Sequence, residues 1–362
     1  MLRLSASCLR SLSSRAAYAT VSQTKVLSQN LPPPSLGGKE VISSLLDQEI
    51  LKALRRPSPK TISLHDVFDQ YSSNASHILD FHLPNESVPR ASRRPLINAA
   101  STDISNEMVL VAHCVKSERT HEITISSGFA LETPENTGET LVLTCAHTLE
   151  QLRQTLPSFK RDSTSSPPDD IVSGTFVISS TNGSLDIHPV TRVASALPRS
   201  DLILLGCNVP GVKTLPLALY PAQKGTSVRA HLVAHHKPAE SGWQPWIGGT
   251  WRKWARGTVL GYRDFAGREA EPGTYDALSH LFFTPLPSEG SSGGPIIDEE
   301  TGAVIGIMLG TRMDSRVEGL KGWGVPSEVV YEVRWCTDSK DSGPYDGQMF
   351  SLPMLGRNSR VI

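Results

Sequence analysis

The hexapeptide Gly-Ser-Ser-Gly-Gly-Pro at residues 290–295 restricts the fold of this chain more than any other segment. Glycine accepts backbone dihedral angles that a side chain forbids, so such a turn can aim several N–H groups at one point. A serine hydroxyl beside converging N–H donors provides what acyl transfer needs, a nucleophile and a binding site for an oxyanion. Alone, the hexapeptide is also compatible with an ordinary Gly/Ser-rich turn.

Two upstream segments supply the base and the orienting acid that a nucleophilic serine requires. The apolar run 141–143 leads to His147, and Asp201 directly precedes the apolar run 202–205. Taken singly, the histidine could be a core or capping residue, and the aspartate could belong to a turn. All three residues stand at the ends of predicted strands, in the order His147, Asp201, Ser292, and this arrangement favours a catalytic triad.

The segments around these residues resemble the three conserved boxes of chymotrypsin-like serine proteases. Thr-Cys-Ala-His at 144–147 resembles the histidine box, Asp-Leu-Ile-Leu-Leu at 201–205 the aspartate box, and residues 290–295 the serine box. Further segments, such as Ser-Gly-Phe-Ala at 127–130 and Gly-Val-Pro-Ser at 324–327, resemble the HtrA/Deg branch. The resemblance covers about residues 105–335 and implies an all-β fold of two six-stranded antiparallel barrels. His147 and Asp201 would lie in the first barrel and Ser292 in the second.

The hexapeptide also fits the Gly-x-Ser-x-Gly nucleophile elbow of α/β-hydrolases. That fold places its catalytic histidine after the serine, whereas the last histidine of this chain is His280. The chain also lacks the alternating long helices of an open parallel sheet. The elbow interpretation is therefore set aside.

The protease resemblance assigns a role to each residue of the boxes. Ser292 would attack a peptide carbonyl, His147 would take and return the proton, and Asp201 would orient the imidazole. The N–H groups of Gly290 and Ser292 would form the oxyanion hole. These roles imply a serine endopeptidase that acts on protein or peptide substrates. A pseudo-protease that binds partners without cleaving them is the alternative.

Substrate preference is predicted from the residues around the nucleophile. By the same resemblance, Leu286 forms part of the primary specificity pocket, and Leu309, Gly310 and Thr311 form the edge that pairs with the substrate backbone. Leu286 stands where an acidic residue would select basic side chains, so we expect an apolar preference. Ser291 replaces the aspartate that zymogen-activated relatives use for activation.

Composition excludes several classes of protein. Hydrophobic residues make up 38% of the sequence and mean hydropathy is -0.19, as in globular proteins. A formal net charge of -1 gives no support to nucleic-acid binding. No apolar stretch approaches the ~18 residues of a transmembrane helix. The five cysteines have no pairing pattern, so we expect free thiols in a reducing compartment. No metal or cofactor is predicted, and the oligomeric state is left open. His231, His235 and His236 are expected in an exposed loop.

The N-terminus predicts a mitochondrial location. Residues 1–25 contain three arginines, one lysine and six serines, and the first acidic residue is Glu40. An arginine-rich, serine-rich and acid-free start is typical of a transit peptide, predicted here over residues 1–22 with cleavage near Tyr18. The sequence does not distinguish the matrix from the intermembrane space. Residues 23–104 form an extension with helical periodicity at 39–51 and 64–71. We expect it to pack against the barrels, and a regulatory or oligomerising arm is the alternative.

The protease domain is predicted over residues 105–336, with the first barrel at about 105–207 and the second at about 208–336. Residues 337–362 form a tail too short for the PDZ module of typical HtrA proteins. Residues 241–256 contain four tryptophans and are expected to be a loop that caps the second barrel. The alternative is a loop in which Trp246 and Trp251 contact a substrate or partner.

Overall fold

The computed structural model describes residues 44–331, except 57–60, 78, 80–82, 85, 96–106, 118–119, 134–137, 162–170, 182–183 and 316. The chain divides into a short unit, Met1–Ile42, which lies outside the described residues, and a larger unit, Ser43–Ile362, which contains all of them. The predicted transit peptide and C-terminal tail therefore lie outside the described residues.

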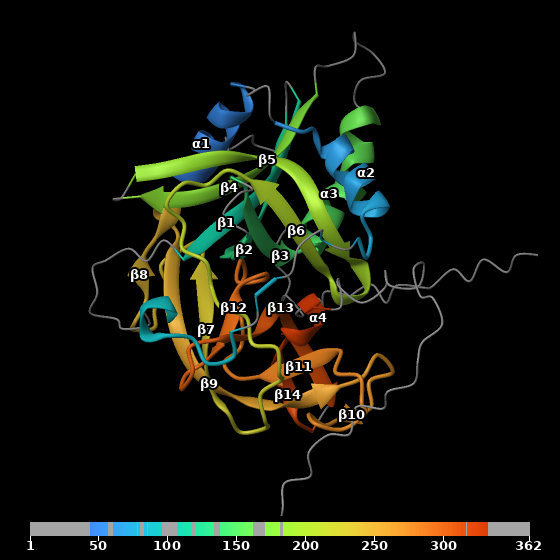
Figure 1. The fold of residues 1–362 in the computed structure, drawn as a ribbon. Coiled ribbons are helices and arrows are strands. Elements are labelled where there is room, and N and C mark those ends of the chain that lie inside the picture. Colours follow the sequence, from blue (N-terminus) through green and yellow to red (C-terminus); the bar gives the residue numbers. More distant parts are fainter. Residues whose placement is uncertain are drawn as a thin grey trace, which may run out of the picture. The chain divides into compact units, whose positions relative to one another are not determined.

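The first barrel is a closed sheet of six antiparallel strands with the order β1-β2-β3-β6-β5-β4 (Figure 1). Its strands are β1 (Met108–Lys116), β2 (His121–Leu131), β3 (Thr140–Cys145), β4 (Val172–Thr181), β5 (Ser184–Leu197) and β6 (Leu202–Cys207). Nearly all side chains of β1 and β6 are buried. One face of these strands lines the barrel interior, and helices or the second barrel cover much of the outer face.

The second barrel follows with the order β9-β11-β14-β13-β12-β7, closed by the pairing of β7 with β9. Its strands are β7 (Ser227–Ala234), β8 (Gln244–Pro245), β9 (Trp251–Arg263), β10 (Glu269–Ala270), β11 (His280–Phe283), β12 (Pro295–Asp298), β13 (Val304–Ser315) and β14 (Gly319–Pro326). The two-residue strands β8 and β10 pair only with β9. The predicted all-β fold of two six-stranded antiparallel barrels is confirmed.

In the part of the chain that the structure describes, four α-helices accompany the barrels: α1 (Leu45–Leu54), α2 (Leu64–Ser73), α3 (His147–Arg161) and α4 (Glu328–Tyr331). The described residues also include the 3-10 turns η1 (Ala91–Arg93), η3 (Pro198–Ser200) and η4 (Ile247–Gly249). Helix α2 confirms the helical segment expected at 64–71, whereas α1 begins at Leu45 and overlaps only part of the segment expected at 39–51, of which residues 39–43 lie outside the described residues. Each helix begins with a serine–aspartate capping box. Helix α3 was not predicted, although Leu149, Leu152 and Leu156 have helical spacing.

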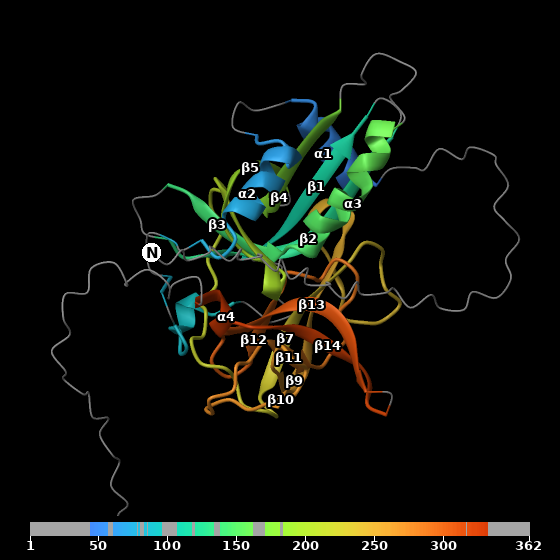
Figure 2. The ribbon, with the colours of Figure 1, turned by 90° about the vertical axis from the view of Figure 1, so that its right-hand side faces the viewer.

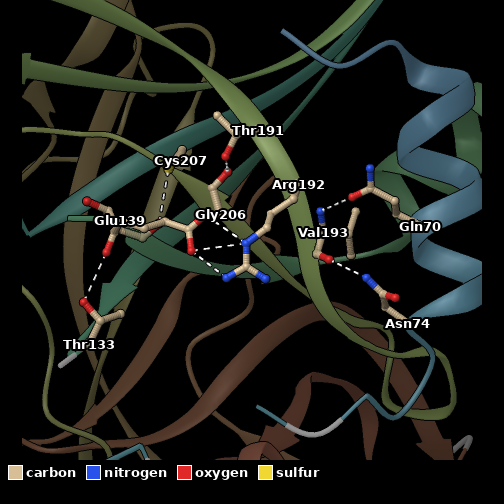
Figure 3. Close-up of polar contacts among 10 residues, drawn as sticks. Gln70, Asn74, Thr133, Glu139, Thr191, Arg192, Val193, Gly206 and Cys207 are labelled. Carbon is tan, nitrogen blue, oxygen red and sulfur yellow. Dashed lines mark hydrogen bonds and ion pairs between the residues drawn. The ribbon is translucent and has the colours of Figure 1, made fainter. Parts of the chain in front are cut away.

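Helix α2 packs on β5 of the first barrel, as expected for the extension. The β5–β6 register shifts on both sides of Val193, which leaves backbone groups of β5 without regular partners in the ladder. Figure 3 shows that Gln70 of α2 and its C-cap residue Asn74 bind the backbone of Val193. The Val193 N–H donates to Gln70 Oε1 at 2.8 Å, and Asn74 Nδ2 donates to the Val193 carbonyl at 2.6 Å. The extension therefore completes the hydrogen bonding of the barrel.

Helix α1 contacts both barrels. It packs against β1 and β4 of the first barrel and against η4, which belongs to the second. Leu46 is 2% exposed, and a Cβ atom added to Gly248 would lie 2.6 Å from Leu46 Cδ1. Gly248 has a φ of +61°, so glycine is required here for both backbone conformation and space. Helices α2 and α3 lie beside the first barrel in Figure 2.

Two expectations for the region 231–256 are corrected. His231 lies on β7 and is fully buried between Trp246 and Trp254, with ring centroids 5.1 Å and 4.9 Å away, so it is not in an exposed loop. The tryptophan-rich segment is not simply a loop, because it contains the short strand β8 and the turn η4, and residues from Trp251 onward form β9. Trp246 is 9% exposed and packs in the core, which leaves little of its surface for a partner.

Candidate active site

The first barrel brings His147 and Asp201 together. Strand β3 ends at Cys145 and His147 begins α3, whereas Asp201 follows η3 and precedes β6. Strands β3 and β6 are paired, and the Ala146 N–H donates to the Asp201 carbonyl at 2.9 Å. Asp201 adopts the left-handed conformation, with φ +56°, and its Oδ2 lies 2.5 Å from His147 Nδ1. This hydrogen bond orients the imidazole through Nδ1 and leaves Nε2 as the ring nitrogen that is available for other partners.

The turn that carries Ser292 is anchored to the first barrel through Ser127 of β2. The Ser127 N–H donates to the Ser292 carbonyl at 2.8 Å, and Ser127 Oγ donates to the Gly290 carbonyl at 2.8 Å. Gly293 has a φ of +83°, and a Cβ atom there would collide with the Ser127 carbonyl. The glycine therefore allows the backbones of the two barrels to approach each other beside Ser292.

The hydroxyl of Ser292 does not bind His147 in this structure. Ser292 Oγ donates to the Leu309 carbonyl at 2.9 Å, and His147 Nε2 lies 3.7 Å from Cys145 Sγ. Among the described residues, no hydrogen bond joins Ser292 to His147, which differs from the expected serine–histidine bond. Catalytic hydrogen bonds of this kind are often loose before substrate binds.

The surroundings of His147 raise the pKa of its imidazole above the ordinary value. The electrostatic interaction with Cys145 is the largest cause; burial opposes it, and the hydrogen bond with Asp201 adds to the increase. The His147 side chain is 41% exposed, so water screens part of these interactions. The protonated imidazole is thus favoured, as required after proton transfer from a serine.

The predicted oxyanion-hole donors are available. Within the turn, the N–H groups of Ser291, Gly293 and Gly294 bind the carbonyls of Ser288, Met308 and Ser291, respectively. The N–H groups of Gly290 and Ser292 have no hydrogen-bond partner among the described residues. The two donors that the sequence predicts for an oxyanion are therefore those that the protein itself leaves unused.

The predicted specificity residues lie in two places. Leu309, Gly310 and Thr311 lie on β13, where Gly310 pairs with Trp323 and Thr311 with Gly322 of β14. The carbonyl of Leu309 is the one that holds the Ser292 hydroxyl. Leu286 lies in the segment between β11 and β12, and its side chain is 49% exposed.

The described residues contain no group of three or more histidine, cysteine, aspartate and glutamate side chains that could hold a metal ion. Cys114, Cys145 and Cys207 are buried free thiols, whereas Cys8 and Cys336 lie outside the described residues. No helix in the described part of the chain is both long and apolar enough to cross a bilayer.

Sequence reasoning did not assign a role at the site to Ser127 or Cys145. Ser127 occurs in the motif at 127–130 that suggested the HtrA/Deg resemblance, and this motif was a usable signal for its position. Cys145 stands two residues before His147, and two such residues within one strand would point to the same side. The strand ends at Cys145, however, so the contact of its sulfur with His147 Nε2 depends on how the chain enters α3 and could not be predicted from the spacing.

Known proteins that are similar to this chain include one family and several solved structures. The family model described as the trypsin-like peptidase domain matches residues 126–307, which is half of the chain. The MamO protease domain from Magnetospirillum magneticum is 17% identical, with 63% of this chain and 96% of that chain covered and a TM-score of 0.37. The Rv3671c protease from M. tuberculosis is 20% identical, with coverages of 71% and 92% and a TM-score of 0.38. Deg5 is 16% identical, with coverages of 62% and 86% and a TM-score of 0.39. No curated protein sequence matches the chain.

Proposed function

The chain belongs to the trypsin-like peptidase domain family, and from this premise we propose that it is a serine endopeptidase that uses Ser292, His147 and Asp201. The observation that carries the proposal is the 2.5 Å hydrogen bond between His147 Nδ1 and Asp201 Oδ2, on the barrel against which the Ser292 turn is anchored. His147 and Asp201 lie 54 positions apart in the sequence, and their hydrogen bond orients the imidazole as a catalytic base requires.

The proposed reaction begins when the Ser292 hydroxyl leaves the Leu309 carbonyl and turns to His147 Nε2. His147 removes the proton as Ser292 Oγ attacks the substrate carbonyl, and Asp201 stabilises the imidazolium that forms. The N–H groups of Gly290 and Ser292 bind the oxyanion of the tetrahedral intermediate. The imidazolium then protonates the leaving amine, and water hydrolyses the acyl-enzyme by the same steps in reverse order.

A fluorophosphonate probe tests this proposal, because it reacts only with an activated serine. We expect the folded protein to be labelled, and Ser292→Ala to remove the labelling. Ser279→Ala is the matched control, because it removes a buried serine hydroxyl of the second barrel that has no hydrogen-bond partner among the described residues. Labelling that survives in Ser292→Ala would place the nucleophile elsewhere.

A pseudo-protease that serves as a binding scaffold is the second candidate. It is favoured by the hydrogen bond of Ser292 to Leu309 and by the contact of His147 with Cys145, because both residues have partners other than each other. A folded protein that neither reacts with the probe nor cleaves fluorescein-labelled casein would support the scaffold.

For substrate preference, we propose an apolar residue before the scissile bond. Support comes from Leu286, which offers an exposed apolar side chain at the predicted pocket wall and no acidic group. A peptide library in which cleavage follows lysine or arginine would contradict this preference.

We further propose that the enzyme works in mitochondrial protein processing or quality control. The support is the arginine-rich, acid-free composition of residues 1–25. Residues 1–30 fused to a fluorescent protein should be imported by isolated mitochondria and shortened near Tyr18. Lack of import would remove the basis for this location without affecting the proposed chemistry.

A further inference from the structure

The residue between the two oxyanion-hole donors, Ser291, has a side chain that is fully buried and hydrogen-bonded. Its Oγ accepts a hydrogen bond from the Val233 N–H at 2.9 Å and lies 2.9 Å from Ser288 Oγ. Ser288 Oγ in turn donates to the Val233 carbonyl at 2.7 Å. These hydrogen bonds form a ring of two hydroxyls, Ser288 and Ser291, and the backbone N–H and carbonyl of Val233. With Ser291 donating to Ser288, each hydroxyl donates one hydrogen bond and accepts one.

At Val233, the two serine hydroxyls of the ring bind the β7 backbone where β12 no longer pairs with it. Strand β12 pairs with β7 only over Val228, Ala230 and the residue between them. Beyond that point the N–H and carbonyl of Val233 bind the two serines. A backbone hydrogen bond from the Ser291 N–H to the Ser288 carbonyl, at 3.1 Å, closes the segment 288–291 on itself.

The position of this ring determines the backbone of the turn. Ser291 lies between Gly290 and Ser292, whose N–H groups are the unused donors. With the Ser291 side chain fixed on β7 and the Gly290 carbonyl fixed by Ser127, the peptide groups on both sides of Ser291, one of which carries the Ser292 N–H, have little freedom to rotate. The Gly290 N–H belongs to the preceding peptide group, which lies inside the segment 288–291 that the hydrogen bond from Ser291 to Ser288 closes. Such preorganisation is what makes an oxyanion hole effective.

We propose that Ser288 and Ser291 are positioning residues that hold the oxyanion hole open without a charged partner. An aspartate at position 291 would need a cation beside it in this buried site, whereas two hydroxyls and one peptide unit satisfy each other. The turn is thus set by folding, and no cleavage of the chain is needed to form it. This inference rests on the proposed endopeptidase function.

The test compares Ser291→Ala and Ser288→Ala with wild type and with Ser279→Ala. The substrate is succinyl-Ala-Ala-Pro-Leu p-nitroanilide, and the inhibitor is the matching peptide aldehyde, whose hemiacetal oxygen occupies the oxyanion hole. Both ring variants should lower kcat about ten- to a hundredfold with KM nearly unchanged, because the turn is displaced and not lost. Aldehyde affinity should fall by the same factor.

Ser288→Thr retains the hydroxyl at a half-buried position and should restore kcat and aldehyde affinity, which a merely structural role for residue 288 would not require. Thermal unfolding of each variant shows whether it folds, and Ser288→Ala keeps the test valid if Ser291→Ala does not. Wild-type kcat and aldehyde affinity in both alanine variants would overturn the inference and leave the proposed function intact. A folded wild type without hydrolysis or fluorophosphonate labelling would overturn both.

Discussion

The Ser292 hydroxyl donates to the Leu309 carbonyl across 2.9 Å, so the proposed nucleophile is held by a backbone group of the predicted substrate-binding edge. A substrate that pairs with this edge would donate its own N–H to Leu309 and release the hydroxyl. Substrate binding and activation of the nucleophile would then be one event.

The first prediction follows from this competition for Leu309. A depsipeptide substrate, in which one N–H facing Leu309 is replaced by oxygen, should lose about tenfold in kcat/KM, the equivalent of one hydrogen bond. Part of the loss should appear in kcat, because Ser292 is released less often. Parallel kinetics with the all-amide peptide provide the comparison, and a change confined to KM would contradict the release step.

Asp201→Asn should lower kcat about 10⁴-fold, because an amide favours the wrong tautomer of His147 while preserving the geometry. Asparagine is suited to this position because, like aspartate, it tolerates the left-handed conformation, here with φ +56°. The measurement is steady-state hydrolysis, with circular dichroism to verify folding. A loss of less than tenfold would show that Asp201 does not orient the base.

The all-β fold of two antiparallel barrels could be predicted because the three boxes whose resemblance implied it are short, local motifs. In two of these motifs, residues 144–147 and 290–295, the residues that suggest catalysis lie next to one another in the sequence. The burial of His231 could not be predicted, because Trp246 and Trp254 cover it from outside its own strand. The Ser292–Leu309 hydrogen bond joins residues 17 positions apart and depends on how β13 passes the turn.

Cys145→Ala should shift the pH dependence of kcat/KM to lower pH. Activity requires neutral His147, and the interaction with Cys145 is the largest cause of the raised pKa of this imidazole. Removing the sulfur lowers that pKa, so the neutral base becomes available in less alkaline solution. Cys207→Ala removes another buried free thiol and should leave the profile unchanged. An unshifted profile in Cys145→Ala would show that the sulfur does not control His147.

Leu46→Ala should destabilise the protein by about 2–5 kcal/mol, because it removes a buried side chain where α1 contacts both barrels. The measurement is urea unfolding followed by tryptophan fluorescence. Leu45→Ala is the control: Leu45 is 63% exposed, and its removal should change stability by no more than about 0.5 kcal/mol. Equal effects of both variants would mean that the extension does not pack as described.

Gly248→Ala should also destabilise the protein, because its Cβ atom would lie 2.6 Å from Leu46 Cδ1. In the Leu46→Ala background the contact with Cδ1 disappears and the contact with the Cβ atom of residue 46, at 2.9 Å, persists, so the cost of Gly248→Ala should be smaller by about 0.5–3 kcal/mol. Part of the cost should persist, because alanine is strained at a φ of +61°. A double-mutant cycle in urea measures the coupling, and strict additivity would contradict the contact.

His231→Phe should make the protein less sensitive to acid. Burial, and then the charge of Arg252, lower the pKa of His231 to about 3, so the unfolded chain binds a proton there at a higher pH than the folded protein does. Stability is therefore lost as pH falls from about 6.5 towards 3, with about 2 kcal/mol lost between pH 7 and pH 5 from this residue.

Phenylalanine does not titrate and removes two ring nitrogens that have no hydrogen-bond partner among the described residues. Urea unfolding at pH 7 and pH 5 should show the smaller difference in His231→Phe. His113 keeps its own contribution, because burial also lowers its pKa to about 3, so some acid sensitivity should persist. His236→Gln, at an exposed position, should behave as wild type. If His231→Phe loses as much stability as wild type between the two pH values, His231 is not buried in its neutral form.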